Sequence, residues 1–186
     1  MDQITKTQPP VTVSSVAVKW GLIWGIVAVI ISAAFSLMFT PDGSPNKLAG
    51  LLVMLIFIGL VIYMQYKAIA EYKNAQDMQY ISFGKAFKIA FIASLISCVI
   101  AILYMYINYT FITDIDIENQ QMLDSQIKAM KERGQNEESI KETIEITKKF
   151  MTLSAKLISS FIMFIIIDVI IALIMAAILK KTPIND

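Results

Sequence analysis

The chain has 186 residues, of which 56% are hydrophobic and 17% are charged, with a net charge of +1. The apolar fraction exceeds the roughly 45–50% of soluble domains, and the charged fraction falls below their roughly 25%. The near-neutral charge gives no general reason to bind nucleic acid, and the lack of histidine removes the commonest catalytic base and metal ligand. With one cysteine, Cys98, no intrachain disulfide is possible.

The first half of the chain predicts two membrane spans. Residues 1–19 are polar and then mixed, which is typical of an N-terminal tail. The run from Trp20 to Phe39 carries no charge over 20 residues, enough for a transmembrane helix and too long for a signal-peptide core. Thr40–Lys47 is rich in turn formers, so Leu48–Tyr66 is expected as a second, antiparallel span. Residues 63–67, at its polar end, predict an interfacial belt.

A polar link and a third span follow. Lys67–Lys88 is expected to continue the second helix to about Asn74 and then to form a surface turn at residues 79–85. Its lysines are expected to mark the cytoplasmic face, or to bind anionic lipid headgroups together with Tyr66, Tyr72 and Tyr80. These topology residues are Lys67, Lys73, Lys85 and Lys88. Ile89–Thr113 is then long enough for a third span.

Residues 114–156 are too charged for a membrane span and predict a helical hairpin. Gly134 fits a helix end, and Asn136 fits the start of the next helix. The apolar positions at one-face spacing are Leu123, Ile127, Met130, Ile140, Ile144 and Met151. We expect an αα-hairpin whose second arm continues into the fourth span without a break, with Thr113 capping the first arm. Acids alternate over residues 114–119 as in a calcium loop, but the glycine and glutamate of such a loop are lacking.

The fourth span, Leu157–Leu179, carries one carboxylate at its middle, Asp168. Such an acid costs roughly 2.5–3.5 kcal/mol on insertion scales, and no lysine or arginine within a predicted span can pair with it. Ser32, Ser97 and Tyr104 are predicted at similar depth. We therefore expect a neutral Asp168 that donates a hydrogen bond to a serine, a tyrosine or a backbone carbonyl. The alternatives are a proton or cation site, or a site completed by another subunit.

Small residues along the first span predict close helix packing. They are Gly21, Gly25, Ala28, Ser32 and Ser36, and the third span carries a similar stripe from Ala86 to Ala101. Because lipid tails are as apolar as leucine, transmembrane helices associate through such close contacts and a few polar ones. We expect packing within a four-helix bundle, with a homodimer face at Gly21 and Gly25 as the alternative.

The distribution of lysines predicts the orientation. Lysines gather in the N-terminal tail, the Lys67–Lys88 link and the C-terminal tail, whereas the first turn holds only Lys47. Both termini are therefore expected in the cytoplasm. The expected organisation is a tail (1–19), three spans with a short outer turn and a cytoplasmic link (20–113), an extracytoplasmic hairpin (114–156), and a fourth span with a cytoplasmic tail (157–186).

The segment Tyr80-Ile81-Ser82-Phe83-Gly84-Lys85-Ala86-Phe87-Lys88 resembles a recurring segment of a bacterial membrane family, the domain-of-unknown-function family numbered 4199. The similarity extends to Tyr104, Tyr106 and Tyr109, and to the hairpin turn with residues 131–134 and 137–140. It covers most of the chain. The resemblance implies four spans and an inner-membrane protein of undefined activity, and it carries over no catalytic residue.

The expected fold is an all-α integral membrane four-helix bundle with an extramembrane αα-hairpin between its third and fourth spans. Two functions remain open for such a protein. We find no nucleophile–base set, phosphate loop or metal cluster, so we expect a non-enzymatic protein with no catalytic residue, metal or cofactor. The hairpin is then an interaction or assembly element for a homo-oligomer or for a membrane or periplasmic partner. The alternative is a small proton- or ion-coupled transporter or channel that uses Asp168.

Overall fold

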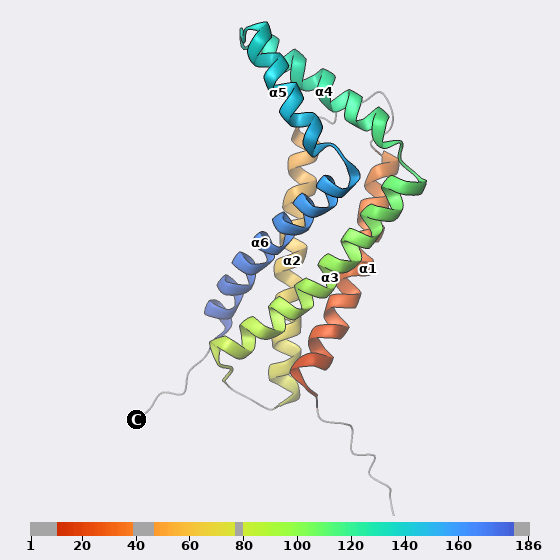
Figure 1. Ribbon diagram of the computed structural model, residues 1–186. Coiled ribbons are helices and arrows are strands. Elements are labelled where there is room, and N and C mark those ends of the chain that lie inside the picture. Colours follow the sequence, from red (N-terminus) through yellow and green to blue (C-terminus); the bar gives the residue numbers. More distant parts are fainter. Residues whose placement is uncertain (1–10, 39–46, 77–79, 181–186) are drawn as a thin grey trace, which may run out of the picture.

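The computed structural model describes residues 11–38, 47–76 and 80–180, with side chains except at 35–38, 47–50 and 53. Within these ranges the chain forms the helices α1 (Val13–Met38), α2 (Lys47–Ala75), α3 (Phe83–Phe111), α4 (Ile115–Glu132), α5 (Glu137–Phe150) and α6 (Leu153–Leu179). Figure 1 shows α1, α2, α3 and α6 running alternately in opposite directions. The start of α1, the end of α2, the start of α3 and the end of α6 therefore lie at one end of the bundle, and α4 and α5 lie at the other.

The outer surface of the four long helices is apolar. These helices are long and apolar enough to cross a membrane. Large exposed side chains on them include Ile26, Ile30, Leu52, Leu55, Leu103, Ile107, Ile162 and Ile178. An apolar surface on every long helix is a liability in water and suits contact with lipid. The predicted all-α membrane bundle with a helical hairpin between its third and fourth spans is confirmed.

Helix α3 is the central packing element, because its contacts with α1 and α6 are the most extensive in the described part of the bundle. The two glycines of α1 allow a close approach of α3. A Cβ at Gly21 would stand 2.7 Å from the carbonyl oxygen of Ala93, and one at Gly25 would stand 2.9 Å from Cβ of Ile100. Both glycines are therefore covered by α3 of the same chain, as predicted for packing within the bundle.

The main core lies at the end of the bundle where α1 begins. Its buried members are Val16, Ala68, Ile69, Tyr72, Ile81, Ala86, Ile89, Ala90, Ile171, Ala172, Met175 and Ala176. Small residues of α3 and of α6 belong to this cluster, and the two helices are in contact, which suits packing by dispersion.

The expected tail over residues 1–19 is wrong in its second half, because α1 begins at Val13. Val16 and Ala17 are buried, with 2% and 0% of their surface exposed. The local reason is a reciprocal cap. The backbone N–H of Ser15 donates to Oγ1 of Thr12 (3.1 Å), and the N–H of Thr12 donates to Oγ of Ser15 (3.0 Å). The pair satisfies N–H groups that a helix start leaves free.

The expected polar link is also largely helix and core. Residues 67–75 complete α2, as expected, but Ala68, Ile69 and Tyr72 are buried at helical spacing. Ile81 is buried as well, with 2% exposed, so the predicted surface turn is wrong at this residue. Ser82 caps α3 by accepting from the N–H of Lys85, which starts this helix well before Ile89.

The hairpin agrees with the prediction at its turn and differs at its ends. Gly134 has φ of 72°, and Asn136 caps α5 by accepting from the N–H of Ser139 at 2.8 Å. Asp114, and not Thr113, caps α4, because a carboxylate can accept two N–H groups there. The second arm does not continue into α6. Thr152 has ψ of 149° and caps a new helix.

Candidate functional site

A cavity of about 430 Å³ lies among α1, α2, α3 and α6. The four predicted polar residues all line it: Ser32 from α1, Ser97 and Tyr104 from α3, and Asp168 from α6. The remaining lining residues, mostly apolar or aromatic, are Trp24, Ala28, Val29, Met54, Phe57, Ile58, Val61, Cys98, Ala101, Met105, Phe164 and Ile167. The cavity thus combines an apolar wall with one carboxylate.

The carboxylate of Asp168 makes no hydrogen bond to any residue in the described part of the chain. The predicted bond to a serine, tyrosine or carbonyl group is therefore not formed there. Ser97 instead donates to the carbonyl oxygen of Ser94 in its own helix, at 2.8 Å. A serine in a helix often satisfies its hydroxyl in this way, which removes it as a partner for another helix.

Gln65 joins α2 to α3 and α6, although the sequence predicts it in an interfacial belt at residues 63–67. That assignment is wrong, since only 2% of Gln65 is exposed. Its Nε2 donates to Oγ of Ser94 on α3 at 2.9 Å and to the backbone oxygen of Asp168 on α6 at 3.4 Å. Its Oε1 is buried without a hydrogen-bond partner among the described residues. A glutamine flanked by Tyr63 and Tyr66, both exposed, gave no sequence signal for burial.

Aromatic residues form one side of the cavity. The rings of Trp24 on α1 and Phe57 on α2 meet edge to face, with centroids 6.3 Å apart and an interplanar angle of 64°. Trp24 is buried and packs with Ala28 and Met64. Such a pair orients ring faces and edges at fixed positions in the wall.

The base of the hairpin is held to the bundle by a second cluster, which was not predicted from the sequence. Nζ of Lys156 on α6 lies 3.2 Å from Oε1 of Glu118 on α4. The hydroxyl of Tyr109 on α3 donates to the same oxygen at 3.3 Å, and Nζ of Lys156 lies 4.9 Å from the Tyr109 ring centroid. The Lys156 side chain is only 12% exposed, so this pair is better shielded from solvent than a typical surface ion pair.

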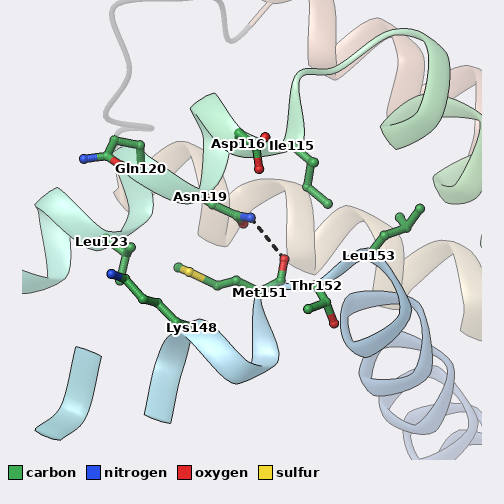
Figure 2. A pocket seen from close by; sticks show the side chains of 9 residues that line it. All are labelled: Ile115, Asp116, Asn119, Gln120, Leu123, Lys148, Met151, Thr152 and Leu153. Atoms are coloured by element: carbon green, nitrogen blue, oxygen red, sulfur yellow. Dashed lines mark hydrogen bonds between the residues drawn. The ribbon is translucent and has the colours of Figure 1, made fainter. Parts of the chain in front are cut away.

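A hollow of about 530 Å³ lies between α4 and the segment where α5 ends and α6 begins (Figure 2). The side chain of Asn119 points toward Met151, and its Nδ2 donates to the Met151 carbonyl oxygen at 3.0 Å. This bond fastens α4 to the break between α5 and α6. Residues 115–119 are helical, so the alternating acids do not form a calcium loop.

The predicted topology lysines lie at the opposite end of the bundle. Lys67 and Lys73 are in the last turns of α2, and Lys85 and Lys88 are exposed in the first turns of α3. Nζ of Lys67 lies 5.7 Å from the ring centroid of Tyr63. Tyr72, expected beside these lysines at the lipid surface, is instead buried in the core.

A further ion pair at that end joins the first two helices. Nζ of Lys19 contacts Oε1 of Glu71 at 2.9 Å, and Nε1 of Trp20 donates to Oε2 of Glu71 at 2.8 Å. Of the predicted seam on α1, Gly21 and Gly25 contact α3, Ala28 is buried and Ser32 lines the cavity. The side chain of Ser36 lies outside the described residues.

Four membrane-length helices around a mainly apolar cavity define a helical multi-pass membrane protein. The chain belongs to the family described as "Protein of unknown function (DUF4199)", whose model matches residues 19–181. The predicted resemblance is therefore confirmed. The comparisons with curated proteins and with solved structures found no match.

Proposed function

We propose that this chain is a non-enzymatic protein of the bacterial inner membrane whose hairpin α4–α5 is an assembly element for a partner protein outside the cytoplasm. The observation that carries the proposal is the bracing of the hairpin. Glu118 and Asn119 on α4 are tied to Tyr109 on α3, Lys156 on α6 and Met151 between α5 and α6, so α3 and α6 brace its base. A braced element loses less conformational freedom when it binds.

The surface of the hairpin suits recognition by charge. Its exposed charged residues are Asp116, Asp124, Lys128, Lys131, Glu132, Arg133, Glu137, Glu138, Lys141, Glu142, Glu145, Lys148 and Lys149. Both signs are interspersed, and the turn around Gly134 stands farthest from the bundle (Figure 1). Mixed charge of this kind selects the partner and fixes how the two surfaces align, and it contributes less to binding affinity. The partner is a membrane or periplasmic protein, or a second copy of the chain.

The test is co-purification from membranes in mild detergent. Replacing residues 115–150 by a short Gly-Ser linker is expected to remove the partner. Lys156→Met keeps the charged surface but loosens the base, so it is expected to reduce recovery of the partner severalfold. Lys85→Met, an exposed lysine at the other end, is the matched control. Unchanged partners after the linker replacement would contradict the proposal.

A second function is favoured by Asp168 in the cavity. An ionisable residue inside a membrane bundle marks an ion or proton path in many transporters. The chain would then be a small proton- or ion-coupled transporter or channel. Proton flux in proteoliposomes that Asp168→Asn abolishes would support this role, and equal flux in the variant and the wild type would contradict it.

A further inference from the structure

We propose that the cavity among α1, α2, α3 and α6 binds a monovalent lipophilic organic cation, with Asp168 as its counter-ion and Trp24, Phe57 and Tyr104 as its aromatic wall. The inference concerns the cavity of the second function, but binding does not require flux. A binding experiment can therefore support or contradict this inference whatever the outcome for either proposed function.

The size of the cavity argues for an organic ligand. Its volume of about 430 Å³ falls within the roughly 300–1,000 Å³ of small-molecule sites. A proton relay needs no such space. A divalent metal needs several oxygen or nitrogen ligands, and no group of three metal-binding side chains gathers in the described part of the chain.

The charge in the cavity argues for a cation. Asp168 is the one acid among the described lining residues, and none of these residues is lysine or arginine. Its carboxylate has no hydrogen-bond partner in the described ranges, so a neutral apolar ligand would leave it unmatched. One carboxylate matches one positive charge, which makes the ligand monovalent.

The wall argues for a lipophilic, aromatic-binding cation. Trp24 and Phe57 are held at a fixed angle of 64° by their mutual contact. Ring faces attract organic cations, and the attraction is strongest where water is excluded. Met54, Ile58 and Phe164 supply the apolar surface that the body of such a ligand would cover. Together these groups fit a molecule that partitions into the bilayer and reaches the cavity from it.

The experiment measures equilibrium binding of radiolabelled tetraphenylphosphonium to the full-length protein in lipid nanodiscs. We expect saturable binding of one cation per chain, displaced by unlabelled cation and not by neutral triphenylphosphine oxide. Asp168→Asn is expected to weaken binding at least tenfold. Asp124→Asn, an exposed acid of the hairpin, is the matched control and should bind like the wild type.

A second pair of variants keeps Asp168 and alters the space. Ala101→Phe fills the cavity and is expected to weaken binding at least tenfold. Leu103→Phe places the same ring on the outer face of the same helix, where Leu103 is 57% exposed, and should have no effect. No saturable binding to the wild type, equal binding by Asp168→Asn, or equal competition by the neutral compound would overturn the proposal.

Discussion

Gln65 joins three helices through one amide group. Its Nε2 donates to Oγ of Ser94 and to the backbone oxygen of Asp168, while its Oε1 has no partner in the part of the chain that the structure describes. Hydrogen bonds between transmembrane helices contribute about 0.6 kcal/mol on average and up to about 1.7 kcal/mol. A buried polar group left without a partner costs about 1–3 kcal/mol, which is the larger effect. Loss of the Ser94 acceptor is therefore expected to destabilise the bundle by more than the Gln65–Ser94 hydrogen bond stabilises it.

The cost of an unpaired buried amide leads us to predict different effects for two neighbouring serines. Ser94→Ala removes the best acceptor of Gln65 and is expected to lower the free energy of unfolding by about 1–2 kcal/mol. Ser97→Ala removes a hydroxyl that bonds only its own helix, so a loss below about 0.5 kcal/mol is expected. Unfolding in mixed micelles, followed by circular dichroism, measures both.

The double variant Gln65→Leu/Ser94→Ala removes both partners together. It is expected to be more stable than Ser94→Ala alone, because no amide then stays buried without its acceptor. Equal losses for Ser94→Ala and Ser97→Ala would show that the contact does not join the helices.

At the scale of the elements, the contact of α1 with α3 depends on the small volume of the α1 glycines. Gly21 faces the backbone oxygen of Ala93, which cannot rotate away as a flexible side chain does. Gly59 on α2 has no heavy atom within 4 Å of an added Cβ. The two glycines are therefore a matched pair, one inside a helix contact and one outside.

Gly21→Ala is expected to reduce the free energy of unfolding by about 1–3 kcal/mol, because the added methyl group forces α1 and α3 apart. Gly59→Ala is expected to leave stability unchanged or slightly higher, since alanine favours helix over glycine. The same mixed-micelle unfolding assay measures both variants. A loss in Gly59→Ala as large as in Gly21→Ala would contradict the α1–α3 contact.

For the whole molecule, the main core and the cavity occupy different levels of the bundle. The buried alanines of α3 and α6 in the main core, Ala86, Ala90, Ala172 and Ala176, lie toward the lysine-bearing end. The cavity lies farther along the same helices, at Ser97, Tyr104 and Asp168. The hairpin lies beyond it, braced by Lys156. The main core, the cavity and the hairpin therefore follow one another along the bundle.

The orientation of the molecule is a prediction at this scale. We expect the hairpin outside the cytoplasm and the start of α3 inside it. In a Cys98→Ala background, Glu138→Cys should react with a membrane-impermeant maleimide in spheroplasts, and Lys85→Cys only after permeabilisation. Both positions are exposed, so access to the reagent decides the result. The reverse labelling pattern would show that the hairpin lies in the cytoplasm and would contradict the prediction.

The sequence by itself determined the number and type of the long helices, the hairpin turn and the four polar residues that line the cavity. Uncharged runs of about 20 residues have few alternatives to a spanning helix, because lipid cannot satisfy backbone polar groups. Gly134 and Asn136 define the turn by local chemistry alone. Depth along each span sufficed to group Asp168 with Ser32, Ser97 and Tyr104.

Only the tertiary structure decided which polar groups meet. The boundaries of α1 and α3 depend on the caps at Thr12 and Ser82 and on a core that buries Val16 and Ile81. Gln65 became the link between helices because the face it occupies is set by α3 and α6, which lie far away in the sequence. For the same reason Asp168 lines an open cavity and its carboxylate is not bonded within the described chain. Helix period and depth follow from local sequence, whereas rotation about each helix axis follows from packing against its neighbours.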